Sequence, residues 1–304
     1  MSPTRRRQGV AAVGHKHRVS QRRVCRVVGQ PRSTQRYEDQ QAGDEPALLQ
    51  AIASLVRKHP RFGYRRIWAL LRADGWKINL KRVHRLWKRE GYRVPVKKTK
   101  KRRLGTSANG IQRRKAAGIN DVWAWDFVHD RDERGRALRW LVIEDEFTRE
   151  SLALEVARSM KATDVLDVLA ELMAIRGAPR HIRSDNGPEF IAKQVRRFLG
   201  QAGVETLYIE PGAPWQNAYA ESFNSRLRDE FLATESFADL AEARELSAWW
   251  RNEYNHRRPH SSLGYVAPAV FAASLGEPPV GAAPLPAAHP ATVSSPPTLI
   301  EVGT

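Results

Sequence analysis

The spacing of apolar residues divides the chain into a helical front part and a mixed part behind it. In the front part, apolar positions recur every three or four residues, which predicts amphipathic helices at 46–59, 64–73 and 79–90. Pro60 ends the first helix, Asn79 caps the third and Gly91 closes it. We therefore expect an all-α unit in the first third of the chain.

A shorter pattern precedes these helices. Residues 19–37 (VSQRRVCRVVGQPRSTQRY) predict one short helix, a break at 29–31 and a second short helix capped near Ser33. This arrangement is compatible with the end of a helix-turn-helix.

After residue 115 the apolar positions alternate, as in β-strands. Residues 121–128 (DVWAWDFV) place three aromatic side chains on one face, and Asp126 stands among small apolar residues on the other. Further strands are expected at 139–144, 151–156, 181–184 and 204–209. Helices are expected from Thr163 to Gly177, from Pro188 to Gly203, and over 217–232 and 236–254.

The order of these elements indicates the fold class. Three strands joined by short turns, followed by alternating helices and strands, predict a mixed α/β sheet flanked by helices, with the first strand in a central position. The all-α unit precedes this sheet. The expected domains are a basic segment (1–44), a helical domain (45–96), a basic linker (97–115), an α/β core (116–275) and a disordered tail rich in Pro and Ala (276–304).

The predicted helix 217–232 has one apolar and one polar face. Ala220, Phe223, Leu227 and Phe231 form the apolar face, and Asn217, Glu221, Asn224 and Arg228 form the polar one. An exposed glutamate on such a face has no particular role by default. Whether Glu221 has a role therefore depends on what the helix packs against.

The distribution of charge narrows the class of partner. Residues 1–115 carry 32 Lys and Arg against 6 Asp and Glu, whereas the remaining 189 residues carry 19 against 27. A surplus of cations spread through predicted helices is typical of a nucleic-acid-binding region. A ribosome-like or merely solubilising basic region is the alternative.

The helix predicted at 79–90 carries the clearest basic face. Its cationic residues are Lys81, Arg82, Arg85, Lys88 and Arg89, opposite an apolar face. Such a helix suits a DNA groove or the backbone phosphates, although a solvated basic helix has the same pattern.

Three carboxylates are placed where they can converge. Asp126 lies within the first strand, Asp185 follows the strand HIRS directly, and Glu221 lies on the polar face of the helix 217–232. Carboxylates gathered without basic partners repel one another, and divalent Mg²⁺ removes that cost. Asp145 and Glu146 also follow a strand, and we interpret them as turn residues.

The segments WAWDFV, IRSDNGPEF and NAYAESFNSRLRDEF resemble the catalytic core of bacterial insertion-sequence transposases, which are related to retroviral integrases. The 35 residues between Asp185 and Glu221 match the spacing of that family's acidic triad, and residues 45–95 resemble its helical DNA-binding unit. The resemblance implies a ribonuclease-H-like fold preceded by a helix-turn-helix domain, and assigns Asp126, Asp185 and Glu221 as catalytic residues and metal ligands. It places Arg228 near DNA, and Asn186, in the turn after Asp185, is a further candidate contact.

The resemblance also implies an activity. A DDE-type transposase cleaves DNA and joins its strands with two Mg²⁺ ions, for which Mn²⁺ can substitute, and Asp126 and Asp185 are expected to bridge the pair. Its partners are the terminal repeats and target DNA, a protein from an upstream reading frame, and further copies of the chain on DNA. A DNA-binding partner or regulator without chemistry, active only with the upstream product, is the alternative. A hydrolase of RNA in hybrids shares the fold but gives no reason for the basic front half.

Two further features of the sequence limit the class of protein and its place in the cell. Cys25 is the only cysteine, which excludes a disulfide framework. Prolines interrupt the weakly charged segment 264–300, which excludes a membrane-spanning helix there. We expect a cytoplasmic, nucleoid-associated protein.

Overall fold

The computed structural model describes residues 3–37, 43–95, 114–184, 187, 192–208 and 218–276. The chain forms two compact units, Met1–Ala53 and Ser54–Thr304, and helix α4 (Glu45–Lys58) crosses the boundary between them. Within the described residues, no helix is both long enough and apolar enough to cross a lipid bilayer.

The first unit contains three helices before α4. They are α1 (Pro3–Lys16), α2 (Gln21–Val28) and α3 (Arg32–Gln35). Val10, Val24 and Cys25 form a small buried cluster between α1 and α2. The sequence pattern did not predict α1, because its apolar residues are few and its start is rich in arginine.

The break between α2 and α3 was predicted correctly. Gly29 adopts a left-handed conformation (φ 67°) and ends α2, as only glycine does readily. The expected cap at Ser33 is wrong: Pro31 precedes α3, and Ser33 lies inside that helix. The fixed φ of proline suits the start of a helix without a side-chain cap.

The second unit begins with two of the predicted front helices. Helix α5 (Tyr64–Ala73) and helix α6 (Leu80–Arg89) pack together, and the Asn79 side chain caps α6 by accepting from the backbone N–H of Lys81 at 2.9 Å. Val83, Leu86 and Trp87 of α6 are buried, which confirms the predicted apolar face.

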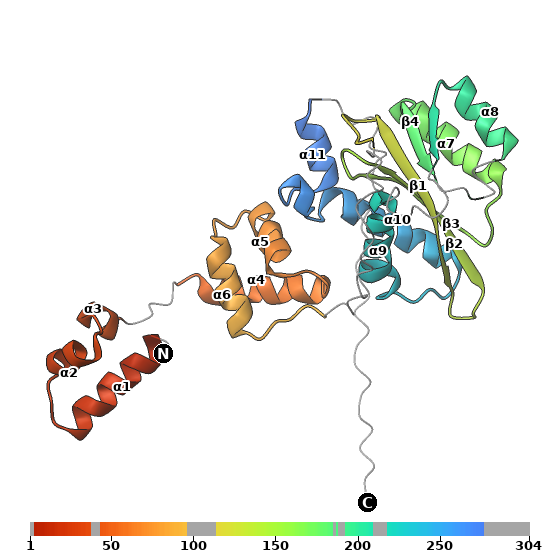
Figure 1. The fold of residues 1–304 in the computed structure, drawn as a ribbon. Coiled ribbons are helices and arrows are strands. Elements are labelled where there is room, and N and C mark those ends of the chain that lie inside the picture. Colours follow the sequence, from red (N-terminus) through yellow and green to blue (C-terminus); the bar gives the residue numbers. More distant parts are fainter. Residues whose placement is uncertain are drawn as a thin grey trace, which may run out of the picture. The chain divides into compact units, whose positions relative to one another are not determined.

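A five-stranded mixed sheet follows, with the order β3-β2-β1-β4-β5 (Figure 1). The strands are β1 (Val122–Arg131), β2 (Ala137–Asp145), β3 (Ser151–Ala157), β4 (His181–Ser184) and β5 (Glu205–Tyr208). Strands β2 and β3 run antiparallel in a meander, and β4 and β5 run parallel to β1. The prediction that the first strand is central is confirmed.

Helices cover both faces of the sheet (Figure 1). On one face, Trp123 and Trp125 of β1 pack with α7 (Ala162–Arg176) and α8 (Lys193–Gln201). On the other, Val128 and Trp140 pack with α9 (Ala218–Leu227), its continuation η3 (Arg228–Leu232) and α10 (Leu240–His256). The alternation of side chains along β1 thus separates an aromatic face from the face that carries Asp126.

Several predicted helix boundaries need correction. Helix α7 begins after Lys161, whose backbone N–H donates to the Asp164 carboxylate at 2.7 Å, so Thr163 is not the cap. Helix α8 begins at Lys193 rather than at Pro188, which lies outside the described residues. Asp239 caps α10 by accepting from the backbone N–H groups of Ala241 and Glu242.

The segment after α10 also contains structure that the pattern did not predict. It forms a short 3₁₀ turn, η4 (Ser261–Leu263), and a further helix, α11 (Pro268–Ser274), which begins at a proline. Proline is favoured at this first position because its missing N–H would have no helical partner there.

Candidate active site

Asp126 lies on the central strand β1 and faces helix α9. Its Oδ1 accepts from the backbone N–H of Phe127 at 2.7 Å, and its Oδ2 accepts from Nδ2 of Asn224 at 2.7 Å. The side chain belongs to the sheet face that also carries Val128, and its residue is only partly buried. The carboxylate is therefore oriented by a helix nearly a hundred residues away in the sequence.

Asn224 connects Asp126 with the residue predicted as the third acid. Glu221 lies in the first turn of α9, three residues before Asn224, so the two side chains share a face of the helix. Glu221 is exposed, whereas Asn224 is buried. The contact between Asn224 and Asp126 thus directs the polar face of α9 toward the central strand, as the pattern of that helix suggested.

Asp185 and Asn186 lie outside the described residues. The strand that precedes Asp185 is β4, which pairs in parallel with β1 from Val122 to Ala124. Ser184, the last residue of β4, is fully buried. The chain that leads to Asp185 is thus anchored beside the strand that carries Asp126.

Buried acidic residues at the end of β2 hold the adjoining turn. Asp145 accepts from the backbone N–H groups of Phe147, Thr148 and Asn120 at 2.8–3.0 Å. Burial raises the pKa of Asp145, and these hydrogen bonds oppose the rise. Glu146 accepts from Nε of Arg183 at 2.7 Å. Both residues therefore shape the fold, in agreement with their interpretation as turn residues.

Glu144 is a feature that sequence reasoning missed. It pairs with Ala124 in the β1–β2 register and so shares the sheet face of Asp126, and it is 2% exposed. Its Oε1 has no hydrogen-bond partner among the described residues. Burial raises its pKa to about 8, which the nearby Arg149 and Arg226 oppose. The sequence did contain a signal for this residue, because the alternation along the predicted strand places Glu144 on a buried face.

The start of α9 is held by an aromatic contact. The guanidinium of Arg149, in the turn between β2 and β3, lies 3.7 Å from the centre of the Tyr219 ring. Tyr219 precedes Glu221 by two residues. This cation–π contact fastens the turn of α9 that carries the glutamate.

The donor atoms fit a hard divalent cation. Such ions prefer oxygen ligands, and this region contains the Asp126 carboxylate and the buried Oδ1 of Asn224, with the exposed Glu221 three residues before Asn224 on α9. That oxygen of Asn224 has no hydrogen-bond partner in the described part of the chain. Over the same residues, which leave out Asp185, no group of three His, Cys, Asp or Glu side chains is close enough to hold a metal.

The cations predicted to contact DNA lie on α6 and η3. On α6, Lys81, Arg85, Lys88 and Arg89 are exposed and Arg82 is half-buried. Arg228 is exposed in η3, which has π-helical geometry, so the predicted helix 217–232 is α-helical only to Leu227. Most of these cations therefore lie at the protein surface, and their contact with DNA stays a prediction.

Comparison with protein families assigns most of the described chain. Residues 116–214 and 202–268 match models of the integrase core domain, and residues 44–100 match an HTH-like domain. The Insertion element IS476 uncharacterized 39.2 kDa protein of Xanthomonas euvesicatoria is 38% identical over 90% of this chain and 78% of its own length. The IS407 uncharacterized 31.7 kDa protein of Burkholderia multivorans is 37% identical over 87% of this chain and 94% of its own length.

The chain belongs to the insertion-element transposase family. Transposase InsD of insertion element IS2 from Escherichia coli is 28% identical over 75% of this chain and 79% of its own length. Among solved structures, the HTLV-2 integrase catalytic core domain in complex with magnesium is 15% identical, with a TM-score of 0.42 over 51% of this chain and 98% of that one. The family assignment accounts for both the ribonuclease-H-like sheet and the helical front part.

Proposed function

We propose that this family member is a DDE-type DNA transposase in which Asp126, Asp185 and Glu221 hold two Mg²⁺ ions. The observation that carries the proposal is the hydrogen bond from Asn224 to Asp126, because it brings the polar face of α9 to the central strand. When bound, the ions would activate a water or a DNA 3′ hydroxyl and stabilise the leaving oxygen.

The chain's own residues have separate parts in this proposal. Asn224 fixes the orientation of the Asp126 carboxylate through its amide N–H, while Arg149 and Tyr219 fix the first turn of α9. Asp126, Asp185 and Glu221 would hold the ions through their carboxylate oxygens. Arg228 would position a DNA phosphate, and the exposed cations of α6 would hold the duplex.

Conservative substitutions test the acidic triad. We expect Asp126→Asn and Glu221→Gln to reduce Mg²⁺-dependent cleavage and joining of the element's own ends at least about a hundredfold, because each removes a charged metal ligand. Asp130→Asn, on the same face of β1, and Glu245→Gln, on α10, are exposed and serve as matched controls. Wild-type rates in either triad variant would refute the assignment.

A second candidate is a DNA-binding partner without chemistry, favoured by the exposed cationic face of α6. Incubating the purified chain alone with the element's ends and Mn²⁺ distinguishes the two. Cleavage excludes the pure binder. Binding without cleavage, restored to cleavage by the upstream-frame protein, supports the partner role, and sizing of the DNA complex tests whether several copies assemble.

A further inference from the structure

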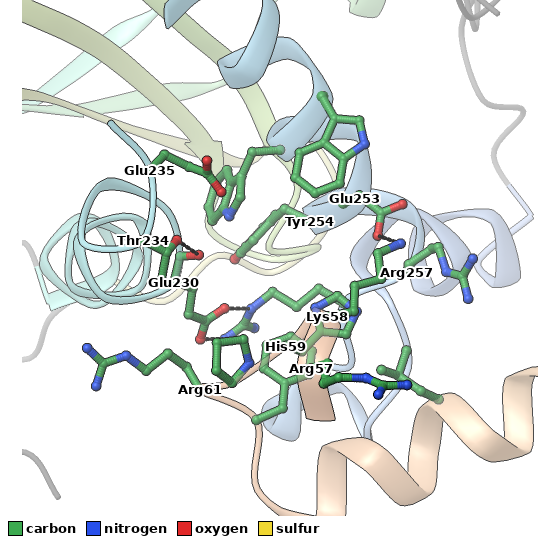
Figure 2. Close-up of a pocket in the computed structure, with 16 residues that line it drawn as sticks. Arg57, Lys58, His59, Arg61, Glu230, Thr234, Glu235, Glu253, Tyr254 and Arg257 are labelled. Atoms are coloured by element: carbon green, nitrogen blue, oxygen red, sulfur yellow. Dashed lines mark hydrogen bonds and ion pairs between the residues drawn. The ribbon is translucent and has the colours of Figure 1, made fainter. Parts of the chain in front are cut away.

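Within the second unit, residues 57–62 before α5 contact η3 and α10, and this contact region is called the seam below (Figure 2). It encloses a cavity of about 240 Å³ lined by both parts. Lys58, Arg61 and Arg257 stand at this seam, yet each lies within 4.0 Å of an acidic side chain: Glu253, Asp229 and Asp74, respectively. These three cations thus form ion pairs within the chain, which favours an internal junction over an anion-binding site.

Glu230 is the centre of this junction. Its carboxylate receives two hydrogen bonds from Arg258, from Nε to Oε2 and from Nη2 to Oε1, both at 2.6 Å. Arg66 of α5 donates from Nη1 to Oε1 at 2.9 Å. One carboxylate therefore binds a guanidinium from the front helices and another from the segment after α10.

The central pair is buried, whereas the outer ion pairs are more exposed. The side chains of Glu230 and Arg258 are 9% and 4% exposed, and that of Arg66 is 25% exposed. The ring of Phe62 lies beneath both guanidiniums, with its centre 5.0 Å from that of Arg66 and 5.8 Å from that of Arg258. Burial would raise the pKa of Glu230, yet the bonds and charges of Arg258 and Arg66 hold it below its usual value.

Glu230 belongs to the same continuous helical segment as Glu221. Helix α9 passes directly into the π-helical turn η3, and Glu230 follows Glu221 by nine residues. Phe231 and Leu232 of that turn are both buried. π-helical turns often occur at functional sites. The contacts of Glu230 therefore act on the far end of the helix that carries the proposed metal ligand.

We infer that Glu230 is a positioning residue: by binding Arg66 and Arg258 together, it joins the front helices to the helix that bears Glu221. The inference rests on the proposed function for the role of Glu221, and on the contacts alone for the junction. Through it, the position of α5, which packs against the proposed DNA-binding helix α6, determines how firmly α9 is held against the sheet.

The test uses Arg66→Met in the full chain, because this change leaves the bidentate pair of Glu230 and Arg258 intact. Arg72→Met, an exposed arginine on the same helix, is the matched control, and Arg66→Lys restores the charge. Hydrogen exchange is measured by mass spectrometry on the free protein, without DNA or metal. We expect amides of residues 218–232 to exchange about three- to tenfold faster in Arg66→Met, with α7 and the melting temperature unchanged, and Arg66→Lys to recover part of the protection.

A second arm measures catalysis on the element's ends. In Arg66→Met we expect kcat to fall about three- to tenfold while the Kd for DNA stays within twofold. Unchanged exchange at 218–232 overturns the inference, and so does faster exchange throughout the protein, which would indicate a general loss of stability. If wild-type protein shows no cleavage, the proposed function fails, yet the exchange arm still decides whether Glu230 joins α5 to α9.

Discussion

Helices α6 and α9 have similar sequence patterns and different surroundings. Each has an apolar face that is buried and a polar face opposite. The polar face of α6 is cationic and mostly exposed, whereas that of α9 contacts the central strand through Asn224. An amphipathic pattern therefore indicates that a helix packs, and only its neighbours show whether the polar side serves binding or chemistry.

The comparison predicts that substitutions on the two helices change different measured quantities. On α9, a substitution should alter metal-dependent turnover with little effect on DNA affinity. On α6, it should alter affinity and its dependence on salt. Two experiments test this division, and a further one examines a buried carboxylate on the sheet face that α9 covers.

The first experiment removes the contact between α9 and the strand. In Asn224→Ala, Asp126 loses the amide that orients it, and loss of such an outer partner of a metal ligand typically costs about 10- to 100-fold in metal affinity or activity. We expect the Mn²⁺ concentration for half-maximal cleavage to rise by that factor, with DNA affinity unchanged. Asn252→Ala on α10 is the control. An unchanged metal requirement would mean that Asn224 has only a packing role.

The second experiment concerns the buried carboxylate beneath this face. The pKa of Glu144 rises on folding from 4.5 to about 8, so the folded protein takes up a proton between these values. The contribution of Glu144 to the free energy of unfolding is therefore largest below pH 4.5, and it decreases as the pH rises toward 8. Asp145, Glu146, Arg149 and Arg226 are the charged groups that modify this titration.

Urea unfolding of Glu144→Gln between pH 5 and pH 8.5, with EDTA present, measures the effect. Glutamine keeps the shape and does not titrate, so we expect the wild type to lose about 4 kcal/mol more than the variant over this range. Glu155→Gln, at an exposed position of β3, is the control. Parallel pH profiles for wild type and Glu144→Gln would show that Glu144 is ionised in the folded protein at all these pH values.

The third experiment examines α6. We expect Arg85→Ala with Lys88→Ala to weaken binding to the element's ends about tenfold at moderate salt and to reduce the salt slope by roughly two, as for two lost phosphate contacts. The matched control is Lys193→Ala with Arg197→Ala, which removes two exposed cations from α8 on the core. Equal effects of both double variants would indicate general electrostatic attraction rather than a role of α6.

Local patterns were most informative where the cause of structure is local. The bounds of α5 and β4 and the cap at Asn79 were predicted correctly, because apolar period and capping chemistry act within a few residues. Helix α1 was not predicted, and the predicted start of α8 was wrong, because both segments contain few apolar residues at helical spacing. Of the candidate site, Asp126, Glu221 and the polar face of α9 came from pattern and resemblance.

By itself, the sequence determined the amphipathic faces, the central position of β1, the basic front half and the family to which the chain belongs. The tertiary structure alone decided that Asn224 binds Asp126, that Glu144 is buried on the same face, and that Glu230 binds both Arg66 and Arg258. The reason is physical: periodicity shows which side of an element avoids water, whereas a hydrogen bond between distant residues depends on how the packed elements are placed.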